Sequence, residues 1–370
     1  MLFHRLGGHI LLEPAWLWGG WQGADGRSPE PCQTPTGVSD SSGFAGTSTG
    51  NKAARPAAGK AEVMRAWQAV GAVIRFKDME HGALAVVAGA ARLGTMVLAL
   101  SLLTLALPCL ATATLRVGAF NIQVFGDTKM SNEGVAGIII SILCRYDMVL
   151  VQEVRDADLS AVTQLMEQLN SVSTFPYDYE ISGPLGRENY KERYLFIYRT
   201  DVVSVVDTYQ FEDPQDVFSR EPFILRVSVP STKVKEFVLV PLHSAPHDAV
   251  TEIDALYDVY LAIVSKWGTD NIMFLGDFNA DCSYVQPSDW SNIRLRTSDV
   301  FKWLLPDGTD TTVGRSDCAY DRIVVCGAKL KRSIVPNSAA VYDFQRALQL
   351  EQEEALAVSD HYPVEVKLTA

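Results

Sequence analysis

The chain has 370 residues, 48% of them hydrophobic, and a formal net charge of −12 at pH 7. This composition excludes a wholly disordered protein. The negative excess lies in residues 114–370, so a domain there will not bind a polyanion by bulk attraction. A nucleic-acid substrate would require a local basic patch, divalent cations, or both.

The N-terminal part of the chain has the composition of a non-globular segment. Residues 1–94 are rich in Gly, Ala, Pro, Ser and Thr without a sustained apolar period, which predicts a disordered low-complexity extension. Residues 95–113 form an uncharged apolar run that ends in Ala111-Thr112-Ala113, a pattern typical of signal-peptide cleavage. We predict cleavage near Ala113 and secretion. The alternatives are a type II signal anchor or a buried helix.

Residues 114–370 form one predicted catalytic domain in which helices flank clusters of strands. Strands are predicted at 115–125 and 147–154, and helices at 134–146 and 157–172. Five strands follow at 177–182, 192–199, 202–211, 223–229 and 236–244. A helix at 249–267 precedes strands at 271–281, 320–327 and 361–368. The pattern predicts an α/β fold, a four-layer sandwich of two packed, mainly antiparallel sheets flanked by helices.

A Ser-Asp-His sequence precedes the last predicted strand. Val364, Val366 and Leu368 alternate with charged residues, which is the period of a half-buried strand. Asp360 and His361 therefore lie on the loop that leads into this strand. An isolated Ser-Asp-His is equally well explained as an ordinary turn. Partners elsewhere in the chain must decide between the two interpretations.

Polar residues stand at the ends of most other predicted strands. They are Asn121, Glu153, Tyr190, Glu192, His243, Asp277, Asn279 and Asp321. Each alone could be a cap or turn residue, but α/β sheets bind ligands at strand ends. The excess of carboxylate and amide oxygens predicts Mg²⁺ or Mn²⁺ rather than zinc. A carboxylate beside each imidazole would prepare it as a general acid or base.

Eight segments of the domain resemble the motifs of the deoxyribonuclease I family, within the endonuclease/exonuclease/phosphatase superfamily. They are GAFNI, VQEVRD, GPLGRENYKERYLFIYR, FSREP, PLHSAP, FLGDFNADCSYV, DCAYDRIVV and SDHYPVEV. YKERYLF, SREP and CAYDR narrow the resemblance from the superfamily to the family. The loop YQFEDPQDVF is shortened relative to the family pattern and lacks a small disulfide, which indicates one branch of the family. The resemblance implies a monomeric, secreted endonuclease that cleaves mainly double-stranded DNA with little sequence specificity.

The resemblance also implies a role for each site residue. Two pairs would supply general acid and base, without a decision on which is which: Glu192 with His243, and Asp321 with His361. Glu153 would anchor Mg²⁺, and the metal and phosphate shell would be completed by Asn121, Asp277, Asn279 and Asp360. DNA would be contacted by Arg155, Tyr190, Arg220 and Tyr320. Structural Ca²⁺ sites look partly kept at Asp213, Asp216, Asp310 and Thr312; the alternative is a solvated acidic loop.

Some positions depart from the family pattern. Gln123 replaces an arginine and Glu188 an asparagine, which predicts lower affinity for duplex DNA. Phe223 stands where actin-sensitive members have a small alanine, while Ile181 keeps an aliphatic residue at the other contact. We therefore expect weak or no inhibition by monomeric actin.

Cys282 and Cys318 lie in polar loops of a domain that is predicted to be exported. They could pair as a disulfide.

Two other functions fit the sequence less well. One is a phosphodiesterase or phosphatase of the same superfamily that acts on a lipid or inositol phosphate. The other is a secreted binding module with a dead site, although every catalytic position carries a chemically competent residue.

Overall fold

The structure is a computed structural model that describes residues 114–187 and 189–370. The predicted extension at 1–94, the signal peptide at 95–113 and the substitution at Glu188 lie outside the described residues. Within the described ranges, no helix is both long enough and apolar enough to cross a membrane.

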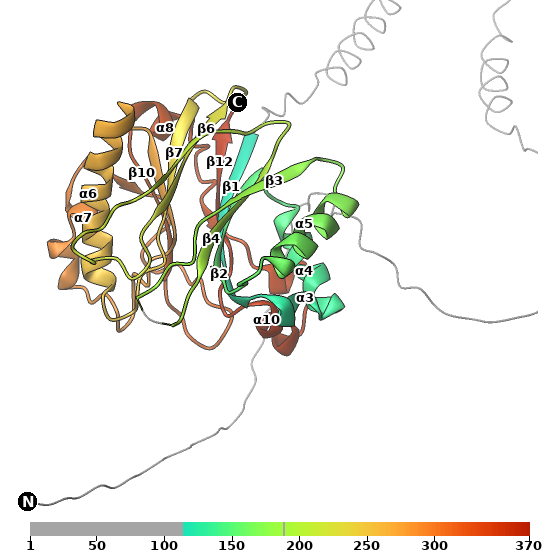
Figure 1. Cartoon of the computed structure of the whole chain (residues 1–370). Coiled ribbons are helices and arrows are strands. Elements are labelled where there is room, and N and C mark those ends of the chain that lie inside the picture. Colours follow the sequence, from blue (N-terminus) through green and yellow to red (C-terminus); the bar gives the residue numbers. More distant parts are fainter. Residues whose placement is uncertain (1–113, 188) are drawn as a thin grey trace, which may run out of the picture.

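Two six-stranded sheets form the centre of the domain (Figure 1). The first contains, in spatial order, β11 (Ala340–Val341), β12 (Val364–Thr369), β1 (Thr114–Phe125), β2 (Met148–Val154), β4 (Arg193–Arg199) and β3 (Tyr177–Ile181). The second contains β5 (Ser204–Gln210), β6 (Phe223–Val229), β7 (Lys235–Pro241), β8 (Ile272–Asp277), β10 (Asp321–Val325) and β9 (Lys302–Trp303). Within the described part of the chain, β1–β2 and β7–β8 are the parallel pairs. The prediction of mainly antiparallel sheets is confirmed.

Helices cover the outer face of each sheet and complete four layers (Figure 1). The first sheet carries α3 (Asp127–Met130), α4 (Glu133–Leu143), α5 (Ser160–Val172) and α10 (Gln352–Val358). The second carries α6 (Ala249–Trp267), α7 (Arg294–Thr297) and the 3₁₀ helix η1 (Asp289–Asn292). The short helices α8 (Ala328–Ser333) and α9 (Phe344–Ala347) were not predicted, and neither were α3, α7 and α10. Segments this short leave almost no periodic signal.

The central strands are buried on both faces, which explains their uninterrupted apolar sequences. In β2, Met148 and Leu150 point into the core between the sheets, while Val149 and Val151 pack against the outer helices. Neighbouring side chains of a strand point to opposite faces. A strand with a covered surface on each side therefore carries apolar residues at every position.

One edge of the two sheets gathers the strand ends that carry polar residues. The helical crossovers between β1 and β2 and between β7 and β8 bring the carboxyl ends of these parallel strands to the same edge. The strands β4, β10 and β12 run antiparallel to β2, β8 and β1, so their first residues lie at that edge too. The topology thus brings the polar ends of both sheets to one place.

A buried side-chain amide joins the two sheets at this edge. Gln152 of β2 donates from Nε2 to the Leu242 carbonyl (2.7 Å) and accepts at Oε1 from the Asp277 backbone N–H (2.9 Å). Gly276 makes room for it: its φ is 126°, and an added Cβ would lie 2.5 Å from the Leu242 oxygen and 2.7 Å from Gln152 Nε2. A residue other than glycine would be strained and would clash here.

The predicted disulfide is present in the structure. Cys282 and Cys318 are bonded, with a Cα–Cα distance of 5.8 Å across a separation of 36 residues. The bond ties the segment after β8 to the segment before β10. Closing a loop of this length stabilises the fold by about 4 kcal/mol on a chain-entropy account.

Replacing Gly276 should therefore destabilise the protein strongly. We expect Gly276→Ala to lower the free energy of unfolding by about 2–5 kcal/mol, because it combines a strained backbone with overpacking. The measurement is chemical denaturation followed by circular dichroism. Gly137→Ala is the matched control, because Gly137 lies in α4 with no atom within 4 Å of its added Cβ. That variant should gain up to about 1 kcal/mol. Equal stability of the two variants would contradict the packing argument.

Candidate active site

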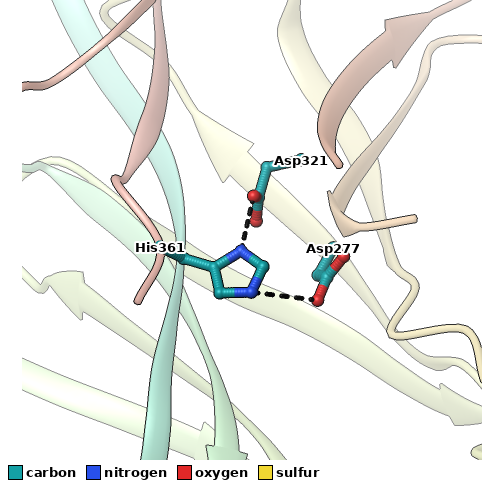
Figure 2. Close-up of side chains that lie close together, drawn as sticks. All are labelled: Asp277, Asp321 and His361. Atoms are coloured by element: carbon teal, nitrogen blue, oxygen red, sulfur yellow. Dashed lines mark hydrogen bonds and ion pairs between the residues drawn. The ribbon is translucent and has the colours of Figure 1, made fainter. Parts of the chain in front are cut away.

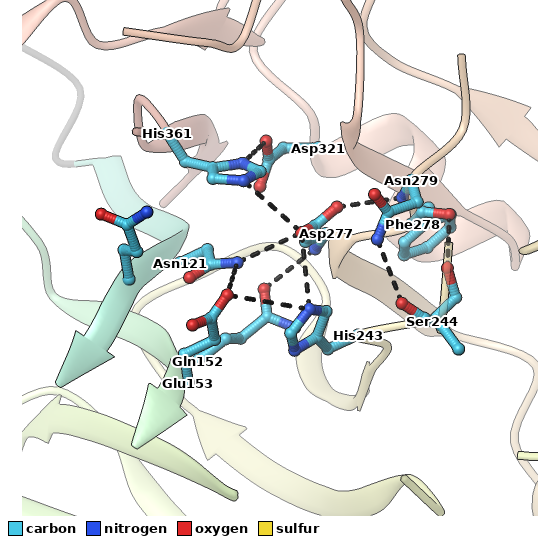
Figure 3. Close-up of polar contacts among 12 residues, drawn as sticks. Asn121, Gln152, Glu153, His243, Ser244, Asp277, Phe278, Asn279, Asp321 and His361 are labelled. Carbon is cyan, nitrogen blue, oxygen red and sulfur yellow. Dashed lines mark hydrogen bonds and ion pairs between the residues drawn. The ribbon is translucent and has the colours of Figure 1, made fainter. Parts of the chain in front are cut away.

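Most of the polar residues predicted at strand ends lie together at this edge of the sheets (Figure 3): Asn121, Glu153, His243, Asp277, Asn279, Asp321 and His361. They come from both sheets, and most of them are buried. Hydrogen bonds and ion pairs join many of these residues, which are dispersed along the sequence, to one another.

The first acid–histidine pair is built around Glu192, which directly precedes β4. His243 Nδ1 lies 2.9 Å from Glu192 Oε2. The same carboxylate receives Arg220, with Nε at 2.6 Å from Oε2 and Nη2 at 3.1 Å from Oε1. Arg220 also donates to the His243 carbonyl (3.1 Å). The His243 backbone N–H in turn donates to the Tyr194 hydroxyl (2.9 Å). His243 is therefore fixed at its ring and at its backbone.

The second pair joins β10 to the loop before β12 (Figure 2). His361 Nδ1 lies 2.8 Å from Asp321 Oδ2, and both residues are buried. The His361 backbone N–H donates to Ser359 Oγ (3.0 Å), and Ser359 donates to the Asn121 carbonyl (2.6 Å). The serine of the Ser-Asp-His sequence thus ties the histidine loop to β1.

Asp277 lies between the two histidines (Figure 3). Its Oδ2 is 3.6 Å from His243 Nε2 and 3.7 Å from His361 Nε2, and it accepts from Asn121 Nδ2 at 3.1 Å. Each imidazole has its Nδ1 occupied by an acid and turns its Nε2 toward the same oxygen. The two Nε2 atoms therefore face one common space.

A strained bulge aims Glu153 into this space. Glu153 has a φ of 58° and Val124, on the neighbouring strand, a φ of 54°. The register between β1 and β2 shifts at this point. Glu153 Oε1 accepts from Asn121 Nδ2 (3.0 Å), and Oε2 accepts from the Val124 N–H (3.0 Å). Left-handed backbone at a valine is unfavourable, and such strain is concentrated at functional sites.

The residues of the site fit a hard divalent cation. Asn121 Oδ1 and Asp360 Oδ1 are buried acceptors without a hydrogen-bond partner among the described residues. Within the described ranges, one group of three His, Cys, Asp or Glu side chains lies close enough together to hold a metal ion: Asp277, Asp321 and His361. Two of its members form the second acid–histidine pair, so Asp277 is the member that is left for a separate ion. Unpartnered oxygens beside several carboxylates suit Mg²⁺ or Mn²⁺.

Asn279 and Asp360, also predicted to belong to the metal and phosphate shell, form hydrogen bonds to other residues of the chain. Asn279 donates its backbone N–H to Asp277 Oδ1 (2.9 Å), but its side-chain amide donates to the Ser244 carbonyl (3.0 Å). Asp360 Oδ2 accepts from Gln123 Nε2 (2.9 Å). In this arrangement Asn279 orients Asp277, and Gln123 orients Asp360.

Burial and the surrounding acids shift the pKa values of the site. Burial disfavours charged His361, but Asp321, Asp277 and Asp360 outweigh it and raise its pKa to about 10. Burial and Arg220 oppose protonation of His243, yet Glu192 and Asp277 raise its pKa above the ordinary value. Burial lowers the pKa of Lys129 to about 8 despite the nearby charges of Asp360 and Glu153.

The residues expected to contact DNA fall into two groups. Arg155 stacks on the exposed ring of Tyr190, with 3.9 Å between its guanidinium carbon and the ring centroid. Tyr320 lies beside His361, with ring centroids 6.2 Å apart. Arg220 is instead committed to Glu192 and the backbone of His243. Its main contacts therefore lie within the first acid–histidine pair.

The four residues expected at calcium sites have hydrogen-bond or ion-pair partners within the chain. Asp213 accepts from the Phe218 N–H (2.7 Å), and Asp216 pairs with Arg187 (3.3 Å). Asp310 Oδ1 accepts from the N–H and the hydroxyl of Thr312 (2.9 and 2.7 Å). The bonds of Asp213 and Asp310 close turns within their own loops, whereas the Asp216–Arg187 pair joins segments that are 29 residues apart.

Several residues of the site were missed by the sequence analysis. They are Gln152, Tyr194, Ser359 and Lys129, whose Nζ donates to the Val358 carbonyl at 2.5 Å. Gln152 and Ser359 immediately precede predicted site residues, so their position was a usable signal. Tyr194 and Lys129 gave no such signal, because an aromatic residue in a strand and a lysine in a polar loop are common.

The Glu192 carboxylate should make stability depend on pH in the acid range. Burial disfavours its charge, but the hydrogen bond with His243 and the charges of His243 and Arg220 lower its pKa to about 2. A depressed pKa contributes stability that is present above the unfolded value of 4.5 and is lost as the pH falls toward 2.

We expect Glu192→Gln to unfold more easily than the wild type at pH 5. The wild type and the variant should differ less in free energy of unfolding as the pH falls from 5 toward 2, by about 3 kcal/mol in all. Urea denaturation at several pH values tests this, with exposed Glu353→Gln of α10 as the control. A difference between Glu192→Gln and wild type that does not vary with pH would rule out this linkage.

Comparisons with known proteins agree with the geometry. A sequence model of the endonuclease/exonuclease/phosphatase family matches residues 118–361. Deoxyribonuclease-1-like 2 of Homo sapiens is 60% identical over 283 residues, which cover 71% of this chain and 95% of that protein. Deoxyribonuclease-1 of Gallus gallus is 55% identical over 278 residues, 74% of this chain and 99% of that protein. The branch indicated by the short loop at residues 209–218 is that of deoxyribonuclease-1-like 2.

A solved structure supports the fold. The crystal structure of humanized D. rerio TDP2 with 14 mutations has a TM-score of 0.50 and 16% sequence identity to this chain. The match covers 70% of this chain and 99% of that one. Motifs, fold and relatives agree: the chain belongs to the deoxyribonuclease I family, within the endonuclease/exonuclease/phosphatase superfamily.

Proposed function

We propose that this protein is a secreted, divalent-cation-dependent endonuclease that hydrolyses DNA phosphodiester bonds with little sequence specificity. Relatives named deoxyribonuclease, at 55–60% identity over most of their length, support DNA hydrolysis. The single observation that carries the mechanism is the placement of His243 and His361. Each holds an acid at Nδ1, and their Nε2 atoms lie 3.6 and 3.7 Å from the same Asp277 oxygen.

The two acid–histidine pairs suit hydrolysis of a phosphodiester. A phosphate between the imidazoles has one Nε2 on the side of the attacking water and the other on the side of the leaving oxygen. One imidazole accepts a proton from water as the water oxygen bonds to phosphorus. The other donates a proton to the leaving oxygen as the P–O bond breaks. The acid at each Nδ1 fixes the tautomer that both steps require.

Mg²⁺ or Mn²⁺ would be held by Glu153 and Asn121, with Asp277 and Asp360 nearby. When bound, the ion stabilises the negative charge that develops on the phosphoryl oxygens. The buried, unpartnered oxygen of Asn121 supports this assignment. The Glu153 carboxylate is fixed in position by hydrogen bonds from the Asn121 side-chain amide and the Val124 backbone N–H.

DNA would bind over the rim of the site through its phosphates and minor groove. The stacked pair of Arg155 and Tyr190 presents a cation and an exposed ring beside the first acid–histidine pair. Tyr320 presents a ring beside the second. Such contacts carry little base information, so cleavage of mainly double-stranded DNA would be nearly independent of sequence. The protein would act as a monomer.

Secretion and calcium binding complete the proposal. The apolar run at 95–113 supports export, and the Cys282–Cys318 disulfide suits an oxidising compartment. Ca²⁺ would bind at the loops of Asp213 and Asp310 and would hold them in place, as structural sites do.

Loss of either histidine should abolish nicking of supercoiled plasmid. We expect His243→Ala and His361→Ala to lower the rate by about 10²–10⁴-fold, the usual contribution of a general acid or base. Chelation of divalent cations should abolish wild-type nicking as well. Circular dichroism must show that each variant keeps the wild-type fold.

The matched control is His247→Ala, because His247 is exposed and takes no part in the site. A His243→Ala or His361→Ala variant with near-wild-type nicking would remove that histidine from the mechanism. A panel that contains inositol phosphates and phospholipids tests the alternative phosphatase function. Hydrolysis of these compounds without cleavage of DNA would refute the nuclease.

Inhibition by monomeric actin should be weak or absent. Phe223 opens β6 and is half-buried, and Ile181 ends the edge strand β3. A partner surface shaped for a small residue at position 223 cannot accept the ring without rearrangement, which costs about 1–3 kcal/mol. Titration of DNA hydrolysis with actin should show stronger inhibition of Phe223→Ala than of wild type. Complete inhibition of the wild type at nanomolar actin would refute the steric argument.

A further inference from the structure

Glu252 is a fully buried acid that takes no part in the chemistry described above. It lies in the first turn of α6, and its Oε1 accepts from the Ala245 backbone N–H (2.9 Å). Its Oε2 is buried without a hydrogen-bond partner among the described residues. Burial raises the pKa of this carboxyl to about 7. A buried acid with one unpartnered oxygen is costly for a fold, so its presence requires a reason.

Glu252 contacts both segments that hold the first acid–histidine pair. Ala245 follows His243 by two residues in the loop after β7. Ser219, whose hydroxyl and backbone N–H favour the charged form of the same carboxyl group without closing a hydrogen bond to its Oε2, immediately precedes Arg220. The negative charge of Glu252 is also one of those that raise the pKa of Arg220.

Arg220 connects these segments to the His243 imidazole through hydrogen bonds. It binds the Glu192 carboxylate through two nitrogens and the His243 carbonyl through a third. Glu192 in turn holds the Nδ1 of His243. A shift of either segment would therefore change the direction in which the His243 Nε2 points.

We propose that Glu252 is a positioning residue for hydrolysis: from α6 it holds the segments of Ala245 and Ser219 together, and thereby aligns Arg220, Glu192 and His243. The inference rests on the proposed function of His243 as an acid or base. Glu252 itself does not touch the substrate. It acts through the hydrogen bonds of Arg220.

Two substitutions at Glu252 separate the effect of losing its hydrogen bond from the effect of losing its negative charge. Glu252→Gln keeps an oxygen that can accept from the Ala245 N–H, while Glu252→Ala removes the acceptor. We expect Glu252→Ala to lower kcat for plasmid nicking by about 10–100-fold with little change in KM, because small misplacement of a reacting group has effects of this size. Glu252→Gln should keep kcat within a few-fold of wild type.

Asp258→Ala is the matched control. Asp258 lies on the same helix, but its carboxylate is exposed and pairs with Arg294 away from the site. This variant should keep the wild-type kcat. A Glu252→Ala variant that is folded and retains the kcat of the control would overturn the proposal.

An NMR titration of the histidine rings gives a readout that a merely structural role would not change. In Glu252→Ala, the pKa of His243 should fall toward its ordinary value, because the hydrogen bond to Glu192 that raises it is loosened. In Glu252→Gln and Asp258→Ala it should stay at the wild-type value. An unchanged His243 pKa in Glu252→Ala would contradict the proposal, whatever substrate the enzyme uses.

These measurements distinguish the two hypotheses. A wild-type protein that does not cleave DNA refutes the proposed function, whereas the titration of His243 still decides the role of Glu252. If Glu252→Ala does not fold, Ser219→Ala replaces it, because this change removes only the hydroxyl that faces the carboxyl group. It should lower kcat several-fold and shift the His243 pKa in the same direction, and wild-type values of both would overturn the proposal.

Discussion

The hydrogen bonds of the Gln152 amide determine how the two sheets meet. One amide reaches from β2 to the Asp277 N–H of β8 and to the carbonyl of Leu242, which directly follows β7 of the other sheet. Leu242 adjoins His243, and Asp277 is the central carboxylate of the site. The relative position of both groups therefore depends on a side chain that is fully buried. Because the amide must donate and accept at once, a carboxylate of the same size cannot replace it.

The two halves of the fold contribute to the site in the same way. Each sheet has one parallel pair joined by a helical crossover, and each delivers acids and part of an acid–histidine pair to the shared edge. This arrangement crowds Glu153, Asp277, Asp321 and Asp360 into a small volume. Like charges at such distances repel, so the site is costly for the fold unless cations balance it. Arg220 and Lys129 supply part of that balance within the chain, and the imidazoles supply more when they are protonated.

Sequence reasoning predicted what recurs along the chain and failed where a contact depends on tertiary structure. The strands, the long helices and the acid–histidine residues are visible because alternation and strand ends mark them. The partner of Arg220 could not be predicted, because an exposed arginine and an arginine bound to a buried glutamate look alike in sequence. Glu252 is hidden for a similar reason: it lies on a helix with several acids, and only the packing of two loops against α6 distinguishes it.

The pairing of the first strand with the last has a consequence for biosynthesis. β1 lies between β12 and β2, and the segment before β12 carries Asp360 and His361. A ribosome-bound chain that has not yet released these residues cannot complete the second acid–histidine pair, however much of the earlier sequence has folded. Proteolytic trimming of the same segment would have an equal effect. The second acid–histidine pair therefore forms only after the segment that precedes β12 has been synthesised and β12 has paired with β1.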